Sequence, residues 1–157
     1  MERGDVIRTG LLIAVAAAVF TAAATASIIS FRTVATGKTF PVGAKPVGYL
    51  SLTRSSERTW FTRLSGSSQN AVAGVPFDQR AIVAVFLDGM PCASNIAASA
   101  ITRSGAALTV HVSWTRPPIG MAMCIRTSTA YIVLTVPRRS LGATPPTRVA
   151  VLARARA

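Results

Sequence analysis

The sequence predicts a mainly β (α+β) fold: a small antiparallel sheet of about six strands with one short helix, preceded by an N-terminal signal or transmembrane helix. Residues 81–87 are seven consecutive apolar residues, closed by Asp88-Gly89. A run of this kind suits a central strand that is covered on both faces. Residues 108–114 instead alternate apolar and polar side chains, which is the pattern of a strand with one exposed face. The length of 157 residues leaves room for one such domain plus an address segment.

The first 30 residues are typical of an export signal. Arg3 and Arg8 precede a charge-free stretch over residues 10–29, within which an Ala-Thr-Ala pattern ends at Ala26. This order predicts a secretory signal peptide that is cleaved near Ala26. The stretch is also long enough to cross a membrane, so an uncleaved single-pass anchor is the alternative. In both cases we expect the remainder of the chain outside the cytoplasm, and periplasmic or secreted after cleavage.

Residues 31–45 contain Gly, Pro and scattered Thr without a sustained period, and are predicted to form a linker to a β domain over residues 46–157. Residues 47–53 are predicted to form the first strand of that domain. These boundaries divide the chain into a signal or anchor over residues 1–30, a linker and a single folded unit.

One short helix is predicted over residues 56–64. Ser56 offers a capping hydroxyl and Glu57 an acidic side chain in the first turn. Trp60 and Leu64 follow four residues apart, so they would share one helix face. Gly66 and the polar residues 67–70 are expected to end this helix in a loop.

Five further strands are expected after residue 80. The strand over residues 81–87 is followed by a hairpin of residues 94–102 and 108–114, joined by the turn signal Ser104-Gly105, with Trp114 on the buried face. Residues 130–136 form a second strongly apolar strand. Residues 147–153 form the last strand, which runs into the C-terminal arginines.

The two cysteines, Cys92 and Cys124, are predicted to form a disulfide, since paired cysteines are usual in exported proteins. Cys92 follows the central strand and Cys124 precedes the strand over residues 130–136. If those strands are antiparallel neighbours, the two sulfurs can meet. Closing that loop would stabilise the fold by about 3–4 kcal/mol. Two reduced, buried thiols are the alternative, and a redox-active pair is disfavoured because there is no Cys-x-x-Cys.

The chain is strongly basic, with 17 Lys and Arg against 5 Asp and Glu and a formal net charge of +12. A positive field predicts affinity for anionic surfaces. The candidate anion- or partner-binding patch consists of Arg126, Arg138, Arg139, Arg148, Arg154 and Arg156. A solvated face without a partner is the simpler interpretation of these arginines. Nucleic acid is disfavoured as a partner, because no aromatic residues are interleaved with them.

No catalytic or cofactor motif is present. Ser113, His111 and Asp78 could be drawn as a hydrolase triad, but the first two lie two residues apart on one strand and no G-x-S-x-G elbow exists. A glycosidase pair would have to come from Glu57, Asp78 and Asp88, which are more simply explained by helix and turn roles. Two cysteines and one histidine do not make a four-ligand metal cage. We therefore expect a non-enzyme without a cofactor or bound metal.

Part of the chain resembles a known family. Val75-Pro76-Phe77-Asp78, the apolar run over residues 81–86 and the segment from Asp88 to Cys92 are similar to the opening of the PrcB C-terminal domain family. Residues 121–124 and 129–138 resemble its later proline–cysteine loop and the strand that follows. The resemblance spans about residues 75–139. The chain departs from the family at residues 93–95, which are Ala-Ser-Asn in place of Gly-Gly-Tyr, and at Ala130, where the family has proline.

The family consists of exported bacterial domains named after a subunit that stabilises a surface protease complex. The resemblance therefore implies a non-catalytic domain that binds or stabilises another exported protein at the envelope, with a protease among the candidate partners. We expect contacts from exposed strand edges and from the loop over residues 117–123, where Met121 and Met123 offer an adaptable apolar surface. The alternative is electrostatic attachment to an anionic envelope or membrane surface through the C-terminal arginines.

Overall fold

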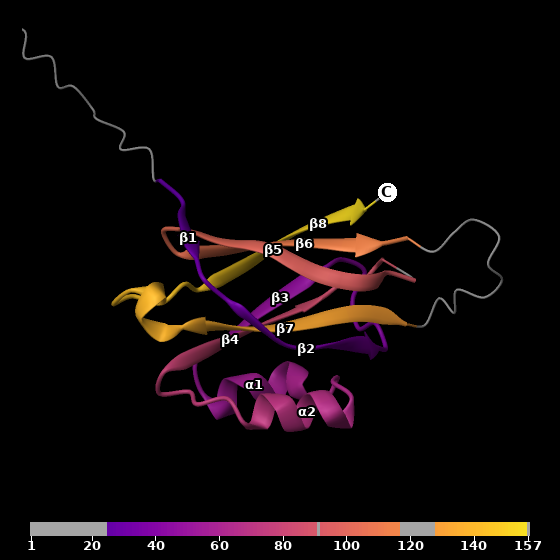
Figure 1. Ribbon diagram of the computed structural model, residues 1–157, viewed down its shortest axis with the longest axis horizontal. Helices are drawn as coiled ribbons and strands as arrows, with labels where there is room; N and C mark the ends of the chain where they lie inside the picture. The colour runs from indigo at the N-terminus through magenta and orange to yellow at the C-terminus, as the bar shows by residue number, and fades with distance from the viewer. Residues whose placement is uncertain (1–24, 91, 117–127, 157) are drawn as a thin grey trace, which may run out of the picture.

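The computed structural model describes residues 25–90, 92–116 and 128–156. In these residues the chain forms three layers, which Figure 1 shows edge-on: one β-sheet at the top, a second in the middle and two helices below. We call the top sheet the outer sheet and the middle one the inner sheet. The mainly β character predicted from the sequence is confirmed.

The inner sheet has the strand order β2-β7-β4-β3, and every neighbouring pair in it is antiparallel. Its strands are β2 (Arg32–Thr39), β7 (Thr129–Pro137), β4 (Arg80–Phe86) and β3 (Val47–Ser51). The outer sheet has the order β1-β5-β6-β8. Its strands are β1 (Ser27–Ile29), β5 (Ser94–Ser104), β6 (Ala107–Thr115) and β8 (Arg148–Arg156). The β6–β8 pair is parallel.

Strand β4 is the predicted central strand, and it is covered on both faces. One set of alternating side chains, which includes Val83 and Val85, packs in the core between the two sheets. The other set, which includes Ile82 and Phe86, packs against the helices. Its neighbour β7 runs antiparallel to it, with Ala84 opposite Val133. The two strongly apolar segments of the sequence thus pair at the centre of the molecule.

The predicted hairpin is also confirmed, because β5 and β6 pair through the turn between Ser104 and Ala107. Along β6 the burial alternates strictly from Ala107 to Thr115. Trp114 lies on the buried face, as expected, and is 7% exposed. The polar side chains between the buried positions face away from the inner sheet, so the outer sheet has one face on the core and one face free.

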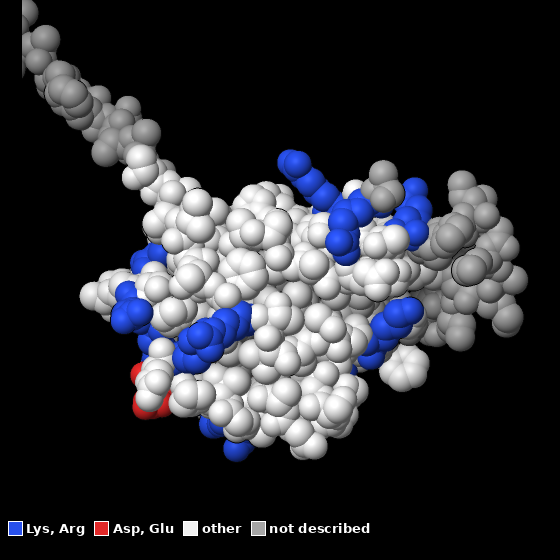
Figure 2. Space-filling model, in the orientation of Figure 1, with Lys and Arg blue, Asp and Glu red and all other residues white. Residues whose placement is uncertain are grey.

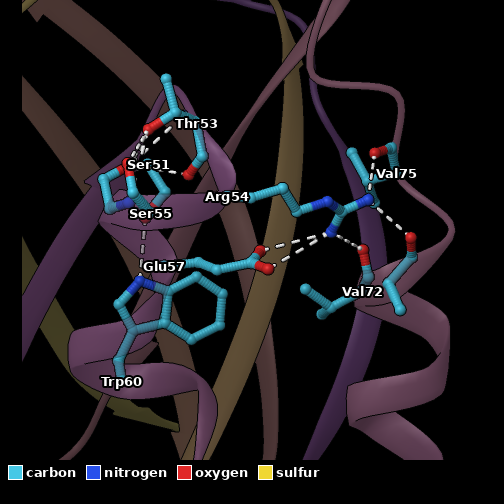
Figure 3. Close-up of polar contacts among 10 residues, drawn as sticks. Ser51, Thr53, Arg54, Ser55, Glu57, Trp60, Val72 and Val75 are labelled. Atoms are coloured by element: carbon cyan, nitrogen blue, oxygen red, sulfur yellow. Dashed lines mark hydrogen bonds and ion pairs between the residues drawn. The ribbon is translucent and has the colours of Figure 1, made fainter.

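Helix α1 (Arg54–Phe61) is fixed by its N-terminus and by one buried tryptophan. Thr53 is the N-cap: its hydroxyl accepts from the backbone N–H of Ser56, and the Ser56 hydroxyl accepts from the N–H of Thr53. This reciprocal pair is a capping box. Trp60 is fully buried and donates its indole N–H to the Ser51 hydroxyl over 3.0 Å, as Figure 3 shows. The indole hydrogen bond ties the helix to strand β3.

Arg54 joins α1 to helix α2 (Gly66–Ala73). The Arg54 side chain is at the centre of the contacts in Figure 3. Its guanidinium lies 3.3 Å from the Glu57 carboxylate. The same group donates to the backbone carbonyls at the end of α2, those of Val72, Ala73 and Val75, at 2.5–3.2 Å. Carbonyls at a helix C-terminus have no partner within the helix, so a cation that donates to them stabilises that end.

Three sequence-based predictions are wrong in detail. The single antiparallel sheet of about six strands is two sheets of four, one of which contains a parallel pair. The predicted linker over residues 31–45 contains β2, a full member of the inner sheet. The single predicted helix over residues 56–64 is instead α1, and the predicted loop over residues 67–70 lies inside the second helix, α2.

Helix α2 forms despite its polar sequence because the inner sheet supplies partners for its hydroxyls. The Tyr131 hydroxyl donates to the Ser68 side chain over 2.8 Å and accepts the backbone N–H of Ser65 over 3.2 Å. Gln69 donates to the Leu64 carbonyl over 3.0 Å. Tertiary hydrogen bonds of this kind give little signal in the local sequence, which explains the missed helix.

The folded unit begins earlier than residue 46. Ile29 in β1 is 3% exposed and belongs to the core between the sheets, paired with Ile101 of β5. A membrane helix that included residues 27–30 would remove this strand from the domain. Of the predicted signal or anchor over residues 1–30, residues 1–24 lie outside the described residues, whereas Ser27–Ile29 form β1. Within the described part of the chain, no helix has the length and hydropathy of a membrane span.

Candidate binding surfaces

The free face of the outer sheet is formed by the side chains that point away from the core. In β6 these are Thr109, His111 and Ser113, and each lies opposite an exposed residue of β8. The opposing residues are Ala150, Leu152 and Arg154, of which Leu152 is 49% exposed. No described helix or strand packs on this face. It is a broad surface of small polar and apolar side chains.

Every charged side chain on this face is an arginine. The strands of the outer sheet contain no Asp or Glu, and β8 contributes Arg148, Arg154 and Arg156, all exposed. Arg156 donates to the backbone carbonyl of Asn95. Arg148 lies at the opposite end of β8, about 26 Å away at the usual rise per residue.

The predicted arginine patch is therefore divided. Arg148, Arg154 and Arg156 share the free face, whereas Arg138 and Arg139 lie in the 3₁₀ helix η1 (Arg138–Leu141), which follows β7 of the inner sheet. Arg126 lies outside the described residues. In Figure 2, the Lys and Arg side chains gather toward the two ends of the visible face, with pale surface between them.

Arg138 and Arg139 line a hollow of about 440 Å³ at the start of β4. Arg138 donates to the Phe77 carbonyl over 2.9 Å, and the neighbouring Arg80 donates to the Thr135 carbonyl over 3.2 Å. Asp78 lines the same hollow and is exposed. Three arginines and one carboxylate therefore share this hollow, whereas the strands of the outer sheet contain no carboxylate.

The acidic side chains are nearly all neutralised. Of the three in the described residues, Glu57 pairs with Arg54, and Asp88 pairs with Arg63 over 2.7 Å. Asp88 is 1% exposed, and the Arg63 guanidinium lies 3.8 Å from the centre of the Phe86 ring. Asp78 is left as the one exposed carboxylate among the described residues. The exposed charge of the described residues, which include fourteen basic side chains, is therefore almost entirely positive.

The candidate catalytic residues do not converge. His111 and Ser113 lie on the free face of the outer sheet, whereas Asp78 precedes β4 of the inner sheet. These three residues therefore lie at different sheets and do not form a triad in this fold. Likewise, Asp88 is held in a structural ion pair, and Glu57 in the Arg54 network. Among the described residues, no cluster of three or more His, Cys, Asp or Glu is placed to hold a metal ion.

Cys92 follows β4 and precedes β5, at the crossing from the inner to the outer sheet. It is disulfide-bonded, and no free cysteine occurs in the described part of the chain. The predicted partner, Cys124, lies outside the described residues, as does the predicted docking loop over residues 117–123. The pairing of Cys92 with Cys124 stays a prediction.

Comparison of the chain with protein-family models, with curated proteins and with solved structures finds no match in any of the three. The resemblance to the PrcB C-terminal domain family over residues 75–139 therefore stays a prediction as well. What the chain does has to be argued from its own surfaces.

Proposed function

We propose that this chain is a non-catalytic, exported interaction domain, and that the free face of its outer sheet binds an acidic surface of a partner protein at the bacterial envelope. One observation carries the proposal. The face is bare in the described structure, and its only charged side chains are Arg148, Arg154 and Arg156. Complementary potentials select partners and speed their encounter, so a surface with arginines and no carboxylates favours an acidic partner.

The other side chains of the face suit a protein contact. Leu152 lies midway along the edge strand β8, opposite His111, with Thr109, Ser113 and Ala150 nearby. Small side chains let a partner approach closely, and arginine is enriched in protein interfaces and their energetic hot spots. The disulfide state of Cys92 supports an oxidising compartment, as export requires.

A photo-crosslinking amino acid at position 152 tests this proposal in the full chain within cells. We expect one acidic envelope protein to be crosslinked, and the yield to fall at least tenfold when Arg154→Glu and Arg156→Glu are introduced together, because charge reversal on an interface suppresses binding. The matched control places the same crosslinker at Thr59, which is exposed on α1, the layer farthest from the outer sheet.

Equal crosslinking from position 59 would contradict the proposal, as would a yield that is unchanged by the two charge reversals. A charge-reversed residue in the crosslinked partner, introduced opposite Arg154→Glu, should restore the yield. That rescue separates a direct charge contact from an indirect effect on folding.

Attachment to an anionic envelope surface through the C-terminal arginines is the second candidate, favoured by the near-absence of exposed carboxylates. The dependence of binding on salt concentration distinguishes this candidate from binding to a protein partner. Purely electrostatic attachment should fade steeply as ionic strength rises, because the Debye length shortens to about 8 Å at physiological ionic strength. Contact through Leu152 and its small neighbours should persist. Retention of the full chain on anionic vesicles, measured over a salt series with wild type and with Arg154→Gln/Arg156→Gln, gives the comparison.

A further inference from the structure

A second exposed apolar feature lies at the end of the inner sheet, in the loop of residues 40–46 between β2 and β3, which we call the Phe40 loop. Phe40 is 75% exposed and Val42 is 76% exposed, and Pro41 between them is exposed as well. A phenylalanine and a valine that project together into solvent at a loop tip bury almost none of their apolar surface in the fold. Such features commonly mark interaction sites.

The loop is held in this position from below. Arg63 donates to the Phe40 carbonyl over 3.3 Å, and the same guanidinium bonds the buried Asp88 carboxylate. On the other side of the loop, Gly89 has φ +77°, and a Cβ at that position would come within 2.1 Å of the Ala44 carbonyl oxygen. Because position 89 has a positive φ and lies so close to the Ala44 carbonyl, glycine is required there. The apolar tip is thus presented by a supported loop.

Lysines flank the tip on both sides. Lys38 and Lys45 are the only two lysines of the chain, and both are exposed. The nearest acidic group described here, Asp88, is buried and paired with Arg63. A hollow of about 170 Å³ beside Lys38 includes Asn95, whose carbonyl accepts from Arg156. The charge around the tip is therefore positive.

An exposed aromatic and an aliphatic residue between flanking lysines are complementary to the boundary of an anionic bilayer. Apolar side chains gain by entering the region between headgroups and acyl chains, and lysines stay at headgroup level with their stems along the apolar surface. We propose that the Phe40 loop inserts into the interface of an anionic lipid membrane, with Lys38 and Lys45 at the headgroups. This surface is distinct from the free face of the outer sheet and does not depend on partner binding there.

Tryptophan fluorescence reports insertion at the loop itself. In Phe40→Trp, the introduced indole is exposed, whereas native Trp60 and Trp114 are 0% and 7% exposed. We expect vesicles of phosphatidylcholine and phosphatidylglycerol with brominated acyl chains to blue-shift and quench the added emission. Pure phosphatidylcholine vesicles should not. Because the readout is local, it applies to the full chain, whichever other segment touches the vesicle.

Two further variants make the test specific. Leu152→Trp puts an indole on the free face of the outer sheet and should not be quenched. Adding Lys38→Gln and Lys45→Gln to Phe40→Trp should raise the lipid concentration for half-maximal quenching by roughly 30-fold, because each lysine strengthens binding to the anionic membrane by about fivefold.

Three results with vesicles would overturn the proposal: no quenching of Phe40→Trp by anionic vesicles, equal quenching by neutral vesicles, or equal quenching of Leu152→Trp. A blue shift that requires envelope proteins and occurs without lipid would overturn it in favour of a protein partner.

Discussion

The inner and outer sheets each have four strands, but they meet different surroundings. In β7 of the inner sheet every residue from Thr129 to Val136 is buried, because the outer sheet covers one face and the helices cover the other. In β6 of the outer sheet only alternate residues are buried. The inner sheet is thus specified by packing on both sides. The outer sheet is specified on one side, and its second face is available for binding.

Among the variants that test this comparison, Phe86→Ala should have the largest effect on the free energy of unfolding. Phe86 is fully buried between the inner sheet and the helices, in ring contact with Tyr49 and Tyr131 at centroid distances of 6.0 and 5.8 Å. We expect a loss of about 3–5 kcal/mol in the free energy of unfolding, measured by urea denaturation of the full chain. The matched variant Leu152→Ala, on the free face of the outer sheet, should change it by no more than about 0.5 kcal/mol.

A large loss from Leu152→Ala would mean that the free face is covered by part of the chain outside the described residues. A small loss from Phe86→Ala would mean that the helix layer contributes little to the fold. Either result would remove the contrast between the two sheets.

Reduction of the disulfide should have the next largest effect. Cys92 lies where the chain crosses from the inner to the outer sheet, so a bond there restrains both. If its partner is Cys124, reduction should lower the unfolding free energy by about 3–4 kcal/mol, because the unfolded chain regains the freedom of the closed loop. Denaturation with and without reductant measures the loss. On reduction, mass spectrometry should show a gain of two hydrogen atoms per chain, whereas a disulfide-linked dimer under non-reducing conditions would contradict the pairing within one chain.

Gly48→Ala tests the seam where the edge strands of the two sheets meet. A Cβ at Gly48 in β3 would come within 2.4 Å of a Val149 methyl carbon in β8. The overpacking should cost about 1–3 kcal/mol. Val149→Ala removes that methyl group, so the double variant should recover most of the loss, and the two single effects should not add. Additive losses would show that the sheets do not meet as described.

The inner strands could be predicted from the sequence because their burial is a property of composition. Seven apolar residues in a row have no stable place except between two layers, and the Ala84–Val133 pairing joins the two segments that meet this description. The alternation in residues 108–114 predicted the free face of the outer sheet in the same way. The local sequence was sufficient to predict a strand where a run of apolar residues or a strict apolar–polar alternation dominated.

Other elements depend on contacts that local patterns do not contain. Strand β2 carries Gly37, which resembles a linker residue, yet a side chain there would collide with the Tyr131 hydroxyl at 2.4 Å. Helix α2 relies on the same Tyr131 and on Arg54, both distant in sequence. The predicted arginine patch is divided in the structure, because residues 138–139 follow a strand of the inner sheet whereas residues 148–156 form a strand of the outer sheet. The Phe40 loop was missed because its Phe-Pro-Val tip lay within an assumed linker.

The smallest expected effect concerns two arginines of the outer sheet. Arg154 and Arg156 are exposed, and Arg156 donates a hydrogen bond to the Asn95 carbonyl. Arg63, by contrast, bonds a buried carboxylate and stacks on Phe86. Arg154→Gln with Arg156→Gln should therefore change the unfolding free energy by no more than about 0.5 kcal/mol. Urea denaturation checks this value alongside the crosslinking yield from position 152. A lost yield with unchanged stability would place these arginines in binding, whereas a stability loss of about 3 kcal/mol or more, as expected on breaking a buried ion pair, would place them in the fold.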